Sequence, residues 1–142
     1  MTGSFRDLKV YQSAFEAARA IFHLSKKFPK EETYSLTDQI RRSSRSVCAN
    51  IGEGYRKRIY PKHFTSKMTD ADGEATETSI WLDFALDCGY IEKQSYDLLF
   101  AKYEEIAGCL MLWPTAQKSS LRNQSLKHFT AFQDCYRHCN CY

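Results

Sequence analysis

Apolar residues recur along this chain every three or four positions, which is the period of an α-helix with one buried face. The clearest case is the segment from Leu36 to Arg58. On a helix, one stripe of this segment is apolar or small and consists of Leu36, Ile40, Ser44, Val47 and Ile51. The flank and the far side are polar and carry Asp38, Arg41, Arg42 and Arg45. The pattern therefore predicts a helix with one face in a core and another face that carries cations.

Residues 5–28 show the same period and predict a long first helix. Its apolar face is expected to consist of Leu8, Tyr11, Phe15, Ala18 and Phe22, widened by Ala14 and Ile21. Pro29 is expected to end this helix near Phe28, because the residue before a proline is biased away from helical dihedral angles.

Two more helices are predicted in the second half of the chain. Pro61 fits the first turn of a third helix, in which an apolar seam repeats as a heptad through Phe64, Met68, Ala71, Ala75, Thr78, Leu82 and Ala85. Gly89 follows as a candidate C-cap. A fourth helix spans residues 94–113 with a face made of Tyr96, Leu99, Tyr103, Ile106, Leu110 and Trp113. Pro114 is expected to terminate it.

Local signals refine the second helix. The hydroxyl of Ser35 or Thr37 is expected to cap its first free amides. Asp38 precedes Arg41 and Arg42 by three and four positions and is expected to pair with both. Gly52 and Gly54 weaken the helix end and mark either its terminus or a close approach of two backbones.

The chain has only six glycines and three prolines among 142 residues, which favours a few long elements. Four amphipathic helices with short connections predict an all-α fold, an antiparallel up-and-down four-helix bundle. The bundle is expected to occupy residues 1–117. Residues 118–142 are expected to form a short C-terminal extension that is partly helical or disordered.

No run of apolar residues is long enough for a membrane span, and the N-terminus does not resemble a signal peptide. We therefore expect a cytoplasmic protein with no membrane association, and reduced cysteines. Three of the six cysteines, Cys48, Cys88 and Cys109, are interpreted as small core residues.

The net charge of +3 is small, but the charges are unevenly distributed. Residues 41–67 contain eight basic residues and only Glu53 as an acid, whereas residues 70–92 contain seven acids and no lysine or arginine. Such a molecule can present a basic patch to an anion, or match its basic face to an acidic face of another copy.

Metal-binding and catalytic patterns are weak. The tail carries ligand types for zinc, namely His128, Cys135, His138, Cys139 and Cys141, but their spacing is too local for a structural zinc site. The acidic ridge of Asp70, Glu74 and Glu77 lacks the Glu-x-x-His pairs of di-iron bundles. His23 and His63 lack a recognisable nucleophile and an orienting carboxylate. The sequence therefore predicts no enzyme, no metal, no cofactor and no small-molecule substrate.

Five motifs in order carry a family resemblance: residues 5–11 (FRDLKVY), 28–29 (FP), 39–43 (QIRRS), 49–54 (ANIGEG) and 89–91 (GYI). Across about residues 4–115, the chain resembles the four-helix bundle proteins encoded by intervening sequences in bacterial 23S rRNA genes. Arg41 and Arg42 match the family's Gln-Ile-Arg-Arg motif, and Asn50, Glu53 and Gly54 match its Asn-Ile-x-Glu-Gly motif. Gly52 stands where the family usually has alanine, and the tail beyond Thr115 exceeds the usual family length.

The resemblance implies a bacterial four-helix bundle of unknown function that commonly assembles as a homopentamer. The family is similar to the accessory variability protein of diversity-generating retroelements, which binds nucleic acid. An RNA or DNA partner is thus implied, and no established catalysis.

Two hypotheses for function remain open. The first is a homo-oligomeric protein that binds the phosphates of RNA or DNA through a basic face made of Arg41, Arg42, Arg45, Arg56, Lys57 and Arg58. No base-stacking motif is evident in the sequence, so backbone charge is expected to drive binding. The alternative is a homo-oligomeric scaffold that binds a protein partner, in which the same arginines pair with carboxylates such as Asp38 or Glu53.

Overall fold

The computed structural model describes the backbone of residues 3–122 and the side chains of residues 3–113. This part of the chain forms four α-helices: α1 (Lys9–Ser25), α2 (Leu36–Arg56), α3 (Pro61–Asp87) and α4 (Lys93–Arg122). Two single 3-10 turns, η1 (Phe5–Asp7) and η2 (Lys30–Glu32), precede α1 and α2. No strand occurs among these described residues. The predicted all-α fold is confirmed.

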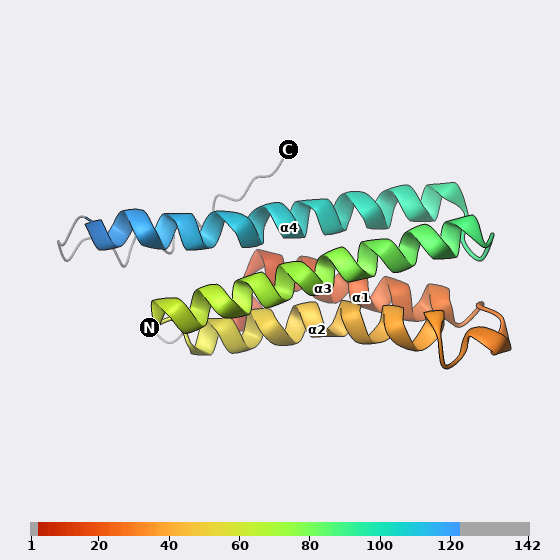
Figure 1. The fold of residues 1–142 in the computed structure, drawn as a ribbon, viewed down its shortest axis with the longest axis horizontal. Coiled ribbons are helices and arrows are strands. Elements are labelled where there is room, and N and C mark those ends of the chain that lie inside the picture. The colour runs from red at the N-terminus through yellow and green to blue at the C-terminus, as the bar shows by residue number, and fades with distance from the viewer. Residues whose placement is uncertain (1–2, 123–142) are drawn as a thin grey trace.

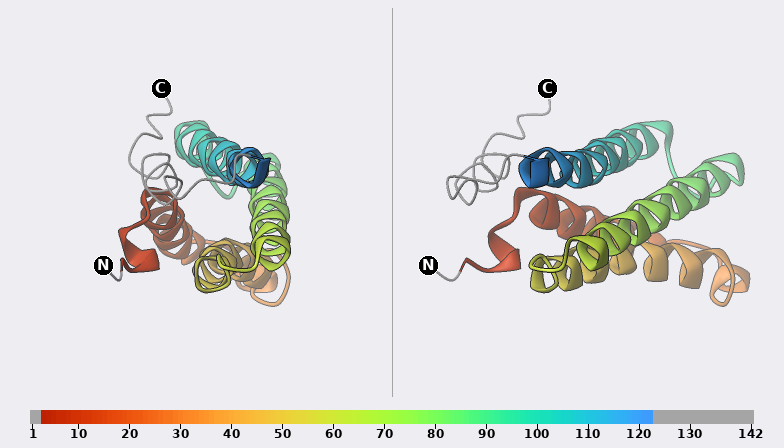
Figure 2. Two further views of the ribbon diagram at one scale, coloured as in Figure 1. Left: turned by 90° about the vertical axis from the view of Figure 1, so that its left-hand side faces the viewer. Right: turned by 60° about the vertical axis from the view of Figure 1, so that its left-hand side comes forward.

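The helices form an antiparallel bundle in which each helix lies beside the next one in the chain (Figure 1). The view along the bundle in Figure 2 shows α1, α2, α3 and α4 in chain order around a shared core, with α4 closing against α1. None of the helices in the described range is long and apolar enough to cross a membrane.

In α2, α3 and α4, the core consists of the stripes that the heptad and helical periods predict. All seven predicted seam residues of α3, from Phe64 to Ala85, are buried. The predicted stripe of α2 is buried as well, including Ser44. On α4, Trp113 stacks on Phe64 of α3 with ring centroids 5.8 Å apart. Helix α3 ends at Asp87 with Cys88 as its C-cap residue, and the predicted Gly89 follows directly with a φ of 74°, the left-handed conformation usual after a helix.

The first helix differs from its prediction in two respects. It does not start at Phe5. Ser4 and Asp7 form a capping box at the start of η1, and Leu8 then adopts an extended conformation that separates η1 from α1. Its buried face is also rotated: Phe15 is 51% exposed, whereas Val10, Ala14, Ala17, Ala18 and Ile21 are buried. Small alanines allow close packing in the core, and the bulky Phe15 remains at the edge. The helix ends at Ser25, one turn earlier than predicted.

The start of α2 is capped by a carboxylate and not by the predicted hydroxyls. The backbone N–H of Leu36 donates to Glu32 Oε2 at 3.3 Å, and the Ser35 hydroxyl donates to the same oxygen. Thr37 is buried within the helix. The hydrogen bonds from Ser35 and from the Leu36 amide lower the pKa of Glu32 below its usual value. The hydroxyl of Tyr90 donates to Glu32 Oε1, which ties this cap to the connection between α3 and α4.

Helix α2 continues through Gly52 and Gly54 and ends at Arg56, so neither glycine is its last residue. Two other expectations are wrong. Helix α4 continues through Pro114 to Arg122, although an interior proline removes one N–H donor and its ring crowds the carbonyl of residue i−4. Cys88 is exposed and is not a core residue, since it follows the last turn of α3, whereas Cys109 is buried and Cys48 is partly buried.

The core contains one polar side chain that lends itself to a stability test. The hydroxyl of Tyr103 is buried and has no hydrogen-bond partner among the described residues, and burial raises its pKa. We expect Tyr103→Phe to raise the free energy of unfolding by about 1 kcal/mol, because it removes an unsatisfied polar group. Urea unfolding measures this change.

Thr78→Val is the companion variant, since the Thr78 side chain lies close enough to Tyr103 to affect the pKa of its hydroxyl. The hydroxyl of Thr78 lies 2.8 Å from Ser43 Oγ and 2.8 Å from the Glu74 carbonyl, so its loss leaves Ser43 without this partner. This substitution is expected to lower stability by about 1 kcal/mol. If Tyr103→Phe instead lowers the free energy of unfolding, the Tyr103 hydroxyl of the wild type has a favourable partner and the prediction is wrong.

Candidate functional site

Three cations surround the ring of Phe22, which lies on the side of α1 that faces α2. The guanidinium carbons of Arg41 and Arg45 lie 5.1 and 5.6 Å from the ring centroid. The ammonium of Lys26 lies 4.7 Å from it. Arg41 is held more firmly, since its Nε donates to Ser25 Oγ at 2.7 Å. The cation–π contacts therefore gather positive charge from two helices at one place.

Carboxylates do not neutralise this cluster. Within residues 3–113, no ion pair involves Lys26, Arg41 or Arg45. Asp38 pairs with Arg42 at 3.9 Å, but the predicted pair with Arg41 is wrong, because Arg41 turns toward Ser25 and Phe22. Uncompensated cations that share one surface raise the local concentration of anions.

Aromatic side chains continue from Phe22 along α1 toward the N-terminus. Phe15 stacks on Tyr11 with centroids 6.1 Å apart, and Tyr11 meets Phe5 edge-on at 4.9 Å. Phe5 in turn lies against Gly52 of α2, and the guanidinium of Arg6 lies 4.6 Å from its ring centroid. We name this surface the aromatic–basic face; it consists of Phe5, Arg6, Tyr11, Phe15, Phe22, Lys26, Arg41 and Arg45.

The six predicted basic residues separate into two groups along α2. Arg56 follows Arg45 by three helical turns, which places the two about 16 Å apart on the same side of the helix. Arg56 and Lys57 are exposed at the end of α2. Arg58 folds back, with one guanidinium nitrogen donating to the Tyr55 carbonyl at 2.7 Å. Only Arg41 and Arg45 of the six join the cation cluster at Phe22.

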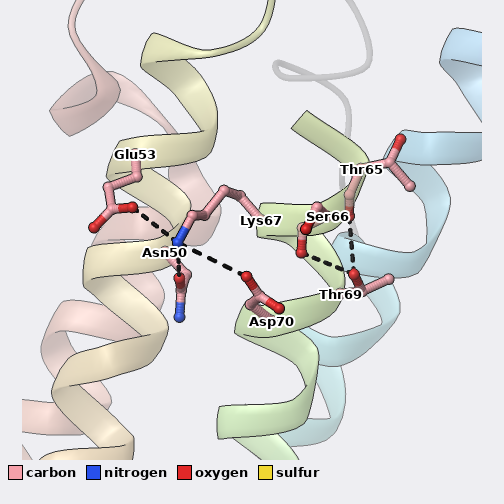
Figure 3. A network of polar contacts seen from close by, with 7 residues as sticks. All are labelled: Asn50, Glu53, Thr65, Ser66, Lys67, Thr69 and Asp70. Carbon is pink, nitrogen blue, oxygen red and sulfur yellow. Dashed lines mark hydrogen bonds and ion pairs between the residues drawn. The ribbon is translucent and has the colours of Figure 1, made fainter. Parts of the chain in front are cut away.

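The motif residues Asn50 and Glu53 form a clamp between α2 and α3 (Figure 3). Lys67 of α3 donates to Asn50 Oδ1 at 3.1 Å and pairs with Glu53 at 2.9 Å. Asp70 lies 3.7 Å from the same ammonium. The hydrogen bond and charge of Lys67 lower the pKa of Glu53, and the hydrogen bond of Glu53 raises the pKa of Lys67.

Gly54 completes this clamp by allowing α3 to approach. A Cβ at position 54 would overlap Met68 Cε and lie 3.2 Å from Lys67 Cβ. Of the two predicted meanings of this glycine, close approach is the one observed, although the nearest atoms of α3 belong to the side chains of Met68 and Lys67. Asn50, Glu53 and Gly54 together have a structural role, which is to join the two helices that pack most extensively.

The Lys67 clamp predicts a pH-dependent contribution to stability. The lowered pKa of Glu53 means that its contribution is fully present above pH 4.5 and is lost as the pH falls through the lowered value. We therefore expect Lys67→Met to destabilise the protein at neutral pH, and the difference from wild type to shrink below pH 4.5. Urea unfolding at several pH values measures it. Lys62→Met, at an exposed position of the first turn of α3, is expected to show no such pH dependence.

The acidic ridge borders a shallow surface hollow, lined by Asn50, Thr69, Asp70, Gly73, Glu74 and Glu77. Partial burial, followed by the charge of Glu77, raises the pKa of Glu74. Within the described residues, no three His, Cys, Asp or Glu side chains are placed to hold a metal ion. The candidate zinc ligands His128, Cys135, His138, Cys139 and Cys141 lie outside this range.

Sequence reasoning missed the aromatic half of the site. The apolar period of residues 5–28 predicts Phe15 and Phe22 in the core. The available signal was the spacing of Phe15, Arg19, Phe22 and Lys26 at i, i+4, i+7 and i+11, which puts alternating aromatic and basic residues on one side of a helix. That spacing became informative only when the structure placed Arg41 and Arg45 opposite it.

Comparisons with known proteins agree with this architecture. The family described as 23S rRNA-intervening sequence protein matches residues 6–111. The chain is also similar to a crystal structure from Bacteroides thetaiotaomicron, described as a protein with unknown function from the S23 ribosomal protein family. The identity is 29%, the TM-score is 0.68, and the match covers 75% of this chain and 95% of that one. No curated protein matches the sequence.

Proposed function

The chain belongs to the 23S rRNA-intervening sequence protein family, and we propose that it is a non-enzymatic protein that binds RNA or DNA through its aromatic–basic face. The observation that carries this proposal is the cluster of Lys26, Arg41 and Arg45 around Phe22 without a carboxylate partner in the described part of the chain. Phosphate is the anion that suits such a cluster, because guanidinium groups donate two parallel hydrogen bonds to it.

The geometry of α1 and α2 supports an extended ligand. Arg6 and Arg56 lie toward one end of the α1–α2 surface, and Lys26 and Arg41 lie toward the other. A polyanion that follows the surface can contact several of these cations at once, which a single small anion cannot do. Arg42, Lys57 and Arg58 are additional candidates at the margins of this path.

We also propose that the protein acts in the cytoplasm as a homo-oligomer, with a pentamer as the expected state. Exposed apolar residues on α3 and α4 support an interface between copies, and they lie on different helices from the cation cluster. They are Ile80, Leu98, Met111 and Leu112. Sedimentation equilibrium of the full chain measures the subunit number.

Salt dependence tests phosphate binding. Fluorescence anisotropy with labelled RNA and DNA, from about 50 to about 300 mM KCl, is expected to give an affinity that falls linearly on a double logarithmic plot. Three or four phosphate contacts correspond to a slope of about −2 to −4. Absent binding, or binding that does not respond to salt, would contradict the proposal and favour the alternative of a scaffold for a protein partner.

A further inference from the structure

We infer that the aromatic–basic face takes a single-stranded nucleic acid and that a base stacks on the ring of Phe15. This inference rests on the proposed function and specifies its ligand. The chemistry it requires is a flat, accessible aromatic ring beside cations that hold the neighbouring phosphates.

Phe15 offers such a ring. It is 51% exposed, and one side is supported by Tyr11, with the two rings stacked at an interplanar angle of 28°. Tyr11 is itself supported by Phe5. A ring held in this way loses little further freedom when a base lies against its open side, which favours binding.

The cations lie at a suitable spacing from Phe15. Phe22 follows Phe15 by two helical turns, or about 10 Å, on nearly the same side of α1. The cluster of Lys26, Arg41 and Arg45 around Phe22 is therefore close enough to contact a phosphate of the strand whose base stacks on Phe15. Arg6 lies beside Phe5, at the other end of the row of rings formed by Phe5, Tyr11 and Phe15. A strand that stacks a base on Phe15 can thus place phosphates beside cations on both sides.

A duplex does not use this arrangement. Its bases are paired and stacked internally, so an aromatic ring on a helix surface reaches only sugars and phosphates. A purely apolar protein partner also fits poorly, because three cations without ion pairs in the described range would have to lose water beside it.

Phe84 provides a matched control within the same chain. It is 52% exposed, but it lies against Trp81 on α3, and its neighbours Asp83 and Asp87 are acidic. Its surroundings repel phosphate, so an equally exposed aromatic ring is not expected to contribute to binding there.

The test compares strands and variants in the full chain at one salt concentration. The probes are oligouridine and oligodeoxythymidine of about 12 nucleotides, and RNA and DNA duplexes of equal length. Single strands are expected to bind about tenfold more tightly than duplexes. Phe15→Ala is expected to weaken single-strand binding by roughly 5- to 100-fold and to leave duplex binding unchanged. Phe15→Tyr and Phe84→Ala are expected to bind like wild type.

The outcomes separate this inference from the proposed function. Equal or tighter binding of duplexes, or equal losses from Phe15→Ala and Phe84→Ala, would overturn the single-strand inference while phosphate binding stands. Failure to bind any of the four probes would overturn both. The ratio of RNA to DNA affinity identifies the source of the strand, and either preference supports the inference. Thermal unfolding of each variant confirms that the exposed substitutions leave the bundle folded.

Discussion

A variant with Arg41→Glu and Arg45→Glu is expected to bind a single-stranded oligonucleotide about 100-fold or more weakly than wild type at about 100 mM salt. Each lost phosphate contact lowers the affinity roughly fivefold at this salt concentration, and reversal of the side-chain charge adds repulsion to that loss. The neutral variant Arg41→Gln/Arg45→Gln is expected to lower the salt slope by about 1.4, or about 0.7 for each single-strand phosphate. Fluorescence anisotropy measures both quantities.

The matched control is Lys62→Glu/Lys93→Glu, which changes the net charge equally at exposed positions of α3 and α4. Lys93 is paired locally with Asp97, away from α1 and α2. This control is expected to lose much less affinity, because only long-range charge is altered. Equal losses in the two double variants would mean that net charge, and not the cluster at Phe22, governs binding.

Replacement of Gly54 is expected to produce the largest loss of stability. Gly54→Val should lower the free energy of unfolding by about 2–3 kcal/mol, because added methyl groups force apart the buried contact of α2 with Met68 and Lys67. The midpoint of urea unfolding measures the loss.

Gly73→Val makes the same chemical change at an open position of α3, where an added Cβ would have nothing within 4 Å. It is expected to change stability by less than about 0.5 kcal/mol. In a double-mutant cycle, Met68→Ala is expected to relieve part of the strain of Gly54→Val, so the two losses should add to more than the loss in the double variant. Equal effects at positions 54 and 73 would refute close packing at Gly54.

The seam of α3 could be predicted from the sequence because its seven positions hold large apolar or small residues in an unbroken heptad, although Trp81 and Phe84 lie at its margin. The first helix was harder. Phe15 and Ala14 are adjacent, and a single sequence does not decide which of the two defines the buried face. Packing decides it: α1 buries its alanines and Ile21 and leaves Phe15 half exposed.

Helix boundaries depended on tertiary contacts that local patterns do not contain. Glu32 caps α2 from the preceding turn and is also bonded to Tyr90, which is 58 residues away in the sequence. Pro114 was interpreted as a terminator because a proline usually ends a helix, but α4 continues past it. The place of Gly89 just after α3 was predictable, since its positive φ is a local property of glycine.

The candidate site was predictable only in part. Periodicity placed Arg41, Arg42 and Arg45 outside the core, but it did not show that Arg42 pairs with Asp38 while the other two turn toward Phe22. That difference depends on α1, which packs beside α2 in the opposite direction. The partner of each arginine is thus determined by a neighbouring helix and not by its own.

Photo-crosslinking gives the most direct test of the central claim, that the surface formed by α1 and α2 binds nucleic acid. The full chain is crosslinked to an oligonucleotide that contains 4-thiouridine, and the modified peptides are identified by mass spectrometry. We expect adducts in residues 5–26 and 41–56, with Phe15 and Phe22 among the modified positions. Adducts confined to α3 and α4, or to residues 123–142, would contradict the claim.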